Sequence, residues 1–251
     1  MLDWQGRVGA LVDRVANRLI WQFASGRRAV ETNVPIVSFT FDDVPDSALI
    51  EGATILERHG VSGTFYIAGG LGGRVEPERT LITPEGCGEL LVRGHEVGCH
   101  TFAHRRVRDM RRLAEDLDRN AEYLKSVGAT KPVRNFAFPY NAAWPLARPE
   151  LARRYRTCRA AGEAINRGSV DPLMLKAVEI RQPERHARDL TRWIDDVVDW
   201  PGWLIFFTHD IASRPTAYGC TPETFDHLVR YAVDKGCRVL PVDRALDEIN
   251  W

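Results

Sequence analysis

The sequence lacks a long uninterrupted apolar run. Its first 23 residues include the charged side chains of Asp3, Arg7, Asp13, Arg14 and Arg18, which interrupt the hydrophobic region that a secretory signal requires. No later stretch is long and apolar enough to cross a membrane. We therefore expect no export by the usual route and a cytoplasmic protein, with a place at the inner face of the membrane as the alternative.

The chain also lacks net charge, paired cysteines and a nucleotide-binding loop. Thirty-four basic side chains balance 34 acidic ones, so no overall field attracts nucleic acid. The five cysteines are scattered and form no CxxC pair, which argues against a disulfide framework and fits a reducing compartment. The glycine-rich segment 69–73 has neither the Lys-Ser/Thr of a phosphate-binding loop nor the GxGxxG order of a dinucleotide site.

The most informative segment that is present is a short strand that ends in two carboxylates. Five of the residues 36–41 are apolar or β-branched, which suits a strand buried on both faces, and Asp42 and Asp43 follow directly. In α/β folds, catalytic groups collect at the carboxyl ends of core strands. Neighbouring residues on a β-type backbone project to different sides, so one Asp can hold a metal while the other handles a proton.

Strand and helix patterns alternate along the rest of the chain, which predicts a parallel α/β barrel. A length of 251 residues is ordinary for such a barrel as a single domain. We expect the barrel over residues 31–251, after an extension over 1–30 in which apolar residues recur at helical spacing. This amphipathic helix is expected to pack on the barrel. Because it combines Trp and Arg, weak peripheral contact with a membrane is the alternative.

Three histidines add metal-binding and proton-transfer groups. His100 and His104 stand four residues apart at the end of a predicted strand, and a helical start there would put both on one side, which suits a single metal ion. Cys99 alternates with His100 along that strand, so it is expected in the core. His209 follows a further apolar strand. Three strands should therefore deliver the two aspartates and the three histidines to one rim.

At this point the chain resembles the polysaccharide deacetylases of carbohydrate esterase family 4, which carry the chitooligosaccharide deacetylase homology domain. Four ordered segments match that family's motifs: TFDD at 40–43, HTFAH at 100–104, FPY at 138–140 and THD at 208–210. The resemblance runs from about residue 34 to residue 240. It implies a distorted barrel of seven or eight βα units.

The resemblance also implies a role for each matching residue. Carried over residue by residue, Asp43, His100 and His104 hold one divalent metal ion, most simply Zn²⁺, with Co²⁺ or Ni²⁺ as alternatives. Asp42 is the general base, and His209 is the general acid. Such an ion leaves positions open for water and for the substrate carbonyl oxygen.

The third motif implies a substrate pocket and contains one departure. The backbone N–H of Tyr140, beside Pro139, is expected to help hold the oxyanion, and Phe207 to line the pocket for the acetyl methyl group. The family usually has an arginine before this motif that orients the base, and this chain has Ala137 there. We expect Arg181, near the end of a predicted strand over 175–180, to take over as the partner of Asp42, or else to be an ordinary solvated arginine.

A further motif of the family is matched only loosely. The segment DVVDW at 196–200 resembles the family's Asp-x-x-Asp-Trp pattern, in which the acid supports the catalytic histidine and the Trp walls the pocket. Asp199 and Trp200 are therefore candidate supporting residues. Because they lie close before the strand that leads to His209, the alternative is that they end a helix.

The resulting expectation is a metal-dependent hydrolase that removes N-acetyl groups from an N-acetylated polysaccharide, oligosaccharide or glycan precursor. One alternative keeps the fold and the metal but attacks a non-sugar amide, such as a cyclic imide or ureide. That subgroup departs from the family in its metal motif. A second alternative is a catalytically silent carbohydrate-binding protein. The missing arginine favours it, and the retained Asp42, Asp43 and His209 count against it.

Overall fold

The strand that ends at Asp42 lies in the middle of a parallel sheet that curls into a barrel. The computed structural model describes residues 4–23, 26–181 and 189–251. Neighbouring strands of the main sheet follow the order β6-β5-β4-β3-β2-β9-β8, and β10 pairs with the start of β2. The strands of this sheet are β2 (Ile36–Asp42), β3 (Thr64–Ile67), β4 (Glu96–Cys99), β5 (Asn135–Ala137), β6 (Thr157–Arg159), β8 (Val178–Glu179), β9 (Trp203–Thr208) and β10 (Arg238–Val239).

All pairings in this sheet are parallel, so every strand delivers its carboxyl end to the same rim. The ring closes between β6 and the segment before β8 through a single bridge, Arg159 to Leu175. This incomplete closure is the distorted (β/α) barrel that the sequence predicts.

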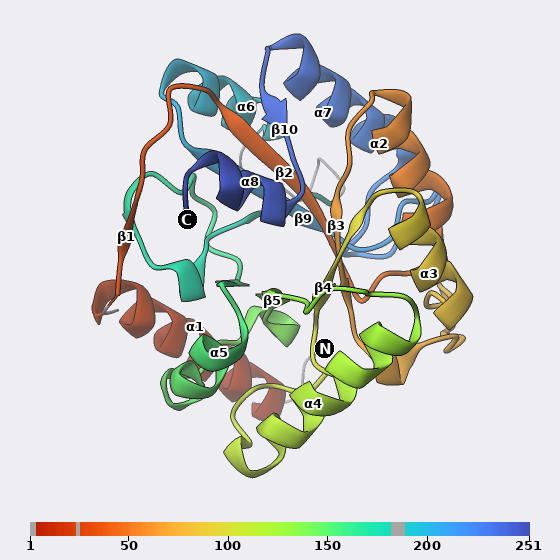
Figure 1. Cartoon of the computed structure of the whole chain (residues 1–251), viewed down its shortest axis with the longest axis vertical. Helices are drawn as coiled ribbons and strands as arrows, with labels where there is room; N and C mark the ends of the chain where they lie inside the picture. The colour runs from red at the N-terminus through yellow and green to blue at the C-terminus, as the bar shows by residue number, and fades with distance from the viewer. Residues whose placement is uncertain (1–3, 24–25, 182–188) are drawn as a thin grey trace.

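Helices cover the outside of the sheet, as Figure 1 shows. Two of them begin as the sequence indicates, because Thr83 and Thr221 accept hydrogen bonds from backbone N–H groups and a proline follows each of them. A π-helical turn, Ala48–Ala53, leads into the first of the covering helices. They are α2 (Thr54–Arg58), α3 (Pro84–Val92), α4 (Met110–Ser126), α5 (Arg148–Arg154), α6 (Leu190–Asp199) and α7 (Pro222–Asp234). The last helix, α8 (Val242–Glu248), packs instead on the inner face of the sheet, against Trp203 and Ile205 of β9.

The core forms around β2, whose seven residues are all buried. The ring of Phe41 stacks on Phe65 of β3, with centroids 4.5 Å apart, and Phe39 stacks on Phe206 of β9. Phe225 of α7 packs edge-on against both. Burial of each such ring contributes roughly 1.5–3 kcal/mol, so this aromatic cluster holds the strand that carries Asp42 rigidly in place.

Several element boundaries differ from the sequence prediction. Residues 101–109 form a loop, not the helical start suggested for the HTFAH segment, and α4 begins at Met110. The strand expected over 175–180 is reduced to Val178–Glu179. Helix α6 begins at Leu190, where Asp189 caps it, and residues 182–188 lie outside the described part. A small antiparallel pair, β1 (Arg28–Val30) with β7 (Gly168–Val170), was not predicted.

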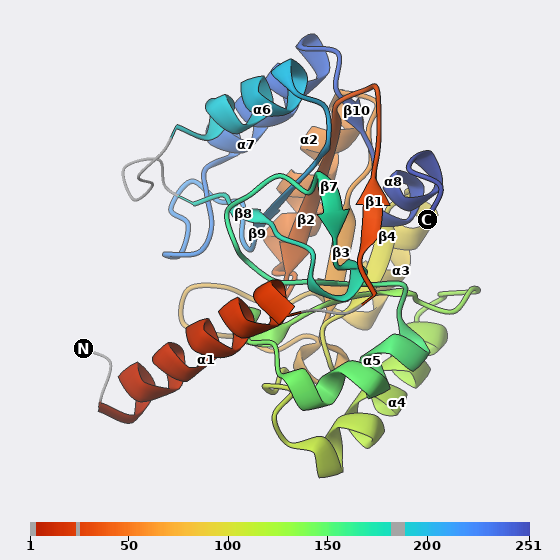
Figure 2. The ribbon, with the colours of Figure 1, turned by 90° about the vertical axis from the view of Figure 1, so that its left-hand side faces the viewer.

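The N-terminal helix α1 (Trp4–Phe23) crosses loops that follow β5 and β6. Asn17 donates to the carbonyl of Asn141 (2.7 Å) and accepts from the N–H of Ala143 (3.0 Å). The indole N–H of Trp21 donates to the carbonyl of Met174 (3.0 Å). Figure 2 shows that the N-terminal end of α1 projects beyond the barrel.

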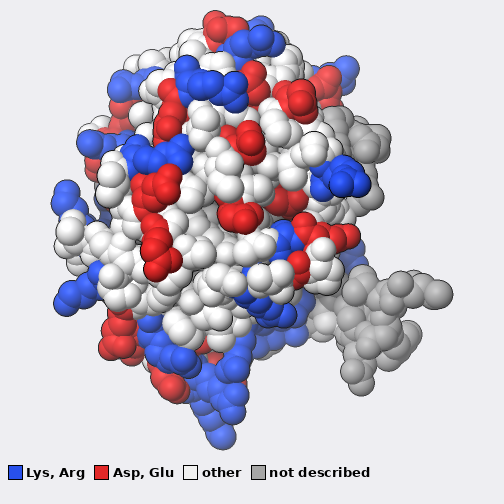
Figure 3. All heavy atoms as spheres, turned by 90° about the vertical axis from the view of Figure 1, so that its right-hand side faces the viewer, with Lys and Arg blue, Asp and Glu red and all other residues white. Residues whose placement is uncertain are grey.

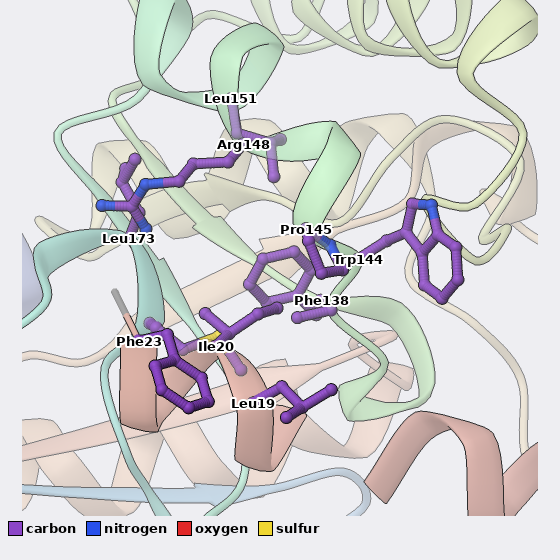
Figure 4. Close-up of a pocket in the computed structure, with 11 residues that line it drawn as sticks. Leu19, Ile20, Phe23, Phe138, Trp144, Pro145, Arg148, Leu151 and Leu173 are labelled. Atoms are coloured by element: carbon purple, nitrogen blue, oxygen red, sulfur yellow. The ribbon is translucent and has the colours of Figure 1, made fainter. Parts of the chain in front are cut away.

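An apolar cavity of about 290 Å³ lies beside α1. Figure 4 shows side chains of α1, α5 and the segment around Leu173 converging on it, with Phe138 among them.

Among the described residues, no helix is long and apolar enough to cross a membrane.

Cysteines and surface charge agree with the sequence analysis. All five cysteines are free and buried. Figure 3 shows Lys and Arg intermixed with Asp and Glu over most of one face of the molecule, with Lys and Arg gathered at its lower edge.

Candidate metal centre

Three side chains on two loops meet at the carboxyl rim of the barrel. The Oδ1 atom of Asp43 lies 3.0 Å from Nε2 of His104 and 3.6 Å from Nε2 of His100. One ligand atom from each residue falls within 4.8 Å of the others, as a single metal ion requires. Oδ1 of Asp43 is buried and has no hydrogen-bond partner among the described residues. An unpaired buried carboxylate oxygen facing two imidazole nitrogens fits a divalent cation well.

The backbone at this rim is held in left-handed conformations. Asp43 has φ 58°, so the chain leaves the strand there and turns its side chain toward the histidines, while Asp42 stays on the strand. Backbone strain of this kind costs about 1–3 kcal/mol per residue and concentrates at functional sites. Six non-glycine residues of this rim show it: Asp43, Val44, Thr101, His104, Tyr140 and Asn141.

The segment that carries the two histidines has a different conformation from the helical start that the sequence suggests. The HTFAH segment is a loop and not the start of a helix, and Asp116 of α4 supports it by accepting the N–H groups of Phe102 (3.0 Å) and Ala103 (3.2 Å). Nδ1 of His100 lies 2.9 Å from the carbonyl of Ala137 and donates to it, which leaves the Nε2 lone pair for a cation. Burial, together with the charge of His100, lowers the pKa of His104 to about 4, so this imidazole is neutral near pH 7.

Asp43 is ionised because basic side chains surround it. Burial alone would raise its pKa, but the imidazoles of His100 and His104, then His209 and Arg79, lower it to about 2. Arg79 donates from its guanidinium to Oδ2 of Asp43 (3.0 Å) and is itself held by Glu76 (2.8 Å). Oδ2 is therefore occupied, and Oδ1 is the atom left to bind a metal.

Asp42 faces the barrel interior and is paired with Arg159, not with Arg181 as expected. The guanidinium of Arg159, buried at the carboxyl end of β6, donates to Oδ1 of Asp42. Burial opposes ionisation of Asp42, but the charge of Arg159, then of His100 and His209, lowers its pKa. Arg181 instead pairs with Glu179 at 3.3 Å.

Strand register explains this correction. Ala137, where the family usually has its arginine, lies directly opposite Arg159 in the β5–β6 pairing. Paired residues of neighbouring parallel strands project to the same face of the sheet. Arg159, on the strand next to β5, therefore reaches Asp42 as an arginine at position 137 would. Its guanidinium also lies over the rings of Phe207 (4.8 Å) and Tyr66 (5.2 Å) and donates to Asn141 (3.2 Å).

Of the other predicted site residues, His209 and Tyr140 lie at the rim, and Pro139 and Phe207 lie beneath it. His209 directly follows β9 at the carboxyl rim, and its charge contributes to the lowered pKa of both Asp42 and Asp43. Nδ1 of His209 is 3.4 Å from the carbonyl of Tyr218. Tyr140 also lies at the rim, with its ring 4.6 Å from that of His104. Pro139 and Phe207 are buried beneath this surface.

Asp199 and Trp200 do not join the rim. They end α6 just before β9 begins at Trp203, whereas His209 follows the other end of that strand. Six residues of strand separate the two ends by roughly 20 Å. Trp200 is 70% exposed and stacks on Arg167. The alternative reading, that the segment ends a helix, is the correct one.

Sequence reasoning missed Arg79 and Arg159. Arg159 carries a usable signal, since it is a charged residue at the carboxyl end of a short predicted strand, where a barrel directs side chains to the rim. Arg79 lies in a loop without a local pattern, and only its contact with Asp43 identifies it.

Comparison with known proteins places this geometry in context. A family model described as polysaccharide deacetylase matches residues 29–154. No curated protein sequence matches the chain significantly. Among solved structures, the chain is similar to a peptidoglycan deacetylase of Bacillus subtilis, with 19% identity, a TM-score of 0.56 and coverage of 88% of this chain and 94% of that one.

Two further structures show the same fold. The first is a family 4 acetyl xylan esterase of Clostridium thermocellum in complex with cobalt, with 17% identity, a TM-score of 0.56 and coverage of 84% and 90%. The second is a pseudoenzyme of carbohydrate esterase family 4 from Bacillus anthracis, with 17% identity, a TM-score of 0.56 and coverage of 87% and 67%.

Proposed function

Because the chain belongs to the polysaccharide deacetylase family, we propose that it is a metal-dependent hydrolase that removes N-acetyl groups from an N-acetylated glycan. The observation that carries this proposal is that two separate sets of side chains meet at the rim. Asp43, His100 and His104 present ligand atoms to one point, and Asp42 is held apart from them by Arg159. A carbohydrate-binding protein without catalysis would have no need for a separately held carboxylate.

Asp43 Oδ1 and the Nε2 atoms of His100 and His104 would hold the ion, most simply Zn²⁺, with Co²⁺ or Ni²⁺ as alternatives. When bound, such an ion supplies Lewis acidity for the amide carbonyl and lowers the pKa of water to about 7.

The protein's own groups account for the proton transfers. Asp42, ionised beside Arg159, takes a proton from the water that attacks the amide carbon. His209 gives a proton to the nitrogen of the leaving sugar amine as the C–N bond breaks, which releases acetate and a free amine. The backbone N–H of Tyr140 donates to the oxyanion, a contact worth roughly 3 kcal/mol. Phe207, packed against Arg159, limits the depth of the acetyl pocket.

Acetate release from N-acetylchitotetraose tests the proposal. The protein is loaded with one equivalent of Zn²⁺ or Co²⁺, and free acetate and amine are measured together, since hydrolysis produces them in equal amounts. Asp42→Asn and His209→Ala should each slow turnover by about 10²–10⁴-fold. Glu89→Gln, an exposed position on α3, is the matched control and should keep the wild-type rate.

The same assay separates the alternatives. Turnover of hydantoin or succinimide in place of the oligosaccharide would indicate an amidohydrolase of non-sugar amides. Binding of the oligosaccharide with no product under any metal would indicate a silent protein, as in the Bacillus anthracis pseudoenzyme, and would contradict the catalytic proposal.

A further inference from the structure

A groove of about 950 Å³ lies between α1 and the loops after β5 and β6. Its volume is at the upper end of the range of about 300–1,000 Å³ that ligand pockets occupy. It is lined from α1 by Asp13, Arg14, Asn17, Arg18 and Trp21, and from the barrel by Arg106, Tyr140, Asn141, Ala161 and Gly162. The family-model match begins at residue 29, so the α1 wall is an addition of this chain to the matched region.

The groove borders the candidate metal centre. Tyr140 lines it and also places its ring 4.6 Å from that of His104. Asn141 lines it as well and accepts a hydrogen bond from Arg159, the partner of Asp42. A saccharide with its acetamide at the metal centre would therefore extend past Tyr140 into the groove.

Specific contacts hold the α1 wall in place. Asn17 bonds both to Asn141 and to Ala143, so α1 is tied to the loop that carries Tyr140. Trp21 packs on Gly162, where an added Cβ would lie 2.8 Å from the indole. The groove is thus a built feature whose two sides cannot move apart without breaking these contacts.

The charges in the groove are mostly positive. Its one carboxylate, Asp13, is already paired with Arg106 (3.1 Å) and with Arg108. Arg106 also stacks on Tyr140, with its guanidinium 4.1 Å from the ring centroid. Arg14 and Arg18 are exposed, stand one helical turn apart on α1 and form no ion pair with any described residue.

We infer that this groove binds an anionic group of the glycan, a carboxylate or a phosphate, through Arg14 and Arg18. Guanidinium groups bind both anions with paired, charge-assisted hydrogen bonds. Stacking of a sugar ring on Tyr140 would position the anion one or more sugar units away from the acetamide under attack. The inference deepens the proposed function and rests on it, because it names the substrate class of the same site.

Binding measured without turnover tests this inference. Zinc-loaded Asp42→Asn protein is titrated calorimetrically with N,N′-diacetylchitobiose, with its 1-phosphate, and with an N-acetylated disaccharide that carries a carboxylate. At least one anionic probe should bind about 10-fold more tightly than the neutral one, and salt at about 0.5 M should reduce the difference. The preferred probe identifies the anion as phosphate or carboxylate.

Paired variants show whether α1 is responsible. In Arg14→Gln/Arg18→Gln, the anionic probes should weaken to the affinity of the neutral probe. Arg111→Gln/Arg230→Gln removes the same charge from exposed positions on α4 and α7 outside the groove and should keep the difference. Equal dissociation constants for all three probes, or an equal loss in the control, would overturn the inference. Tight binding of an anion by a wild-type protein that releases no acetate would instead contradict the proposed catalysis and leave the groove assignment intact.

Discussion

At the amino end of the barrel, the first residues of β3, β4, β5 and β6 form a hydrogen-bonded polar ring, and its one carboxylate, Glu96, is partly buried. Glu96 of β4 accepts hydrogen bonds from Thr64 (2.8 Å), from Asn135 and from the N–H of Asp243 (3.0 Å). These donors are neutral. Burial, with added repulsion from Asp243, therefore raises the pKa of Glu96 to about 7.

At the carboxyl end, Asp42 and Asp43 are more deeply buried than Glu96, yet their charged forms are favoured. Arg159 beside Asp42, and the histidines with Arg79 around Asp43, overcome the effect of burial and lower both pKa values. The comparison shows that burial alone does not decide the state of a carboxylate in this barrel. Nearby basic side chains decide whether the carboxylate is charged, and these side chains lie at the carboxyl end of the strands.

The largest expected effect comes from removing a carboxylate at the carboxyl end. Asp43→Ala should lose the metal, because it deletes one of the three proposed ligands, whereas Asp42→Asn should keep the metal and lose only the rate. Metal content after gel filtration, measured by atomic emission, checks both. Equal occupancy in the two variants would contradict the assignment of Asp43 as the ligand.

The second effect comes from removing the cation and leaving the carboxylate. Arg159→Met leaves Asp42 buried without its main cationic partner, so its pKa should rise and the acid limb of the pH–rate profile should move to higher pH, with a fall in kcat/KM of about 100-fold at pH 6. Thermal stability should also fall, since an unpaired buried charge is costly.

Arg181→Met is the matched control for this experiment, because Arg181 pairs with Glu179 and not with Asp42. Its acid limb should stay in place. An unshifted profile in Arg159→Met, or the same shift in both variants, would contradict the proposal that Arg159 keeps Asp42 ionised as the base.

A third prediction concerns the amino end. The pKa of Glu96 is about 7 in the folded protein, above the unfolded value of 4.5. The contribution of this group to the free energy of unfolding is therefore fully present below pH 4.5 and is lost as the pH rises through 7. The loss should approach about 3 kcal/mol. Glu96→Gln removes this dependence and should gain stability relative to wild type between pH 5 and pH 8. Urea unfolding at pH 5 and pH 8 measures the free energy of unfolding of each protein. The same change with pH in both proteins would refute the prediction.

The smallest effect is expected from Arg79, which contacts Asp43, the proposed ligand, through Oδ2. Arg79→Gln frees Oδ2 of Asp43 and removes a nearby charge, and changes of this kind typically alter metal affinity about 10-fold. Competition with a chromophoric chelator gives the dissociation constant, and the Co²⁺ absorption spectrum reports the change in ligand geometry. Arg74→Gln, an exposed neighbour that pairs with Glu76, is the control.

The sequence by itself determined the strand–helix alternation, the buried strand before Asp42 and Asp43, and the motifs that end further strands at His100 and His209. These features are local, because each depends on residues within one element and on the rule that parallel strands end at one rim.

Only the tertiary structure decided which side chains meet there. Arg159 replaces Arg181 because the register of β5 and β6 places it opposite Ala137, and Asp199 fails to reach His209 because a whole strand separates them. Likewise, α1 becomes a groove wall through Asn17 and Trp21, whose partners lie more than 100 residues away in the chain. Contacts across such separations depend on register and packing, and no local pattern in the sequence encodes them.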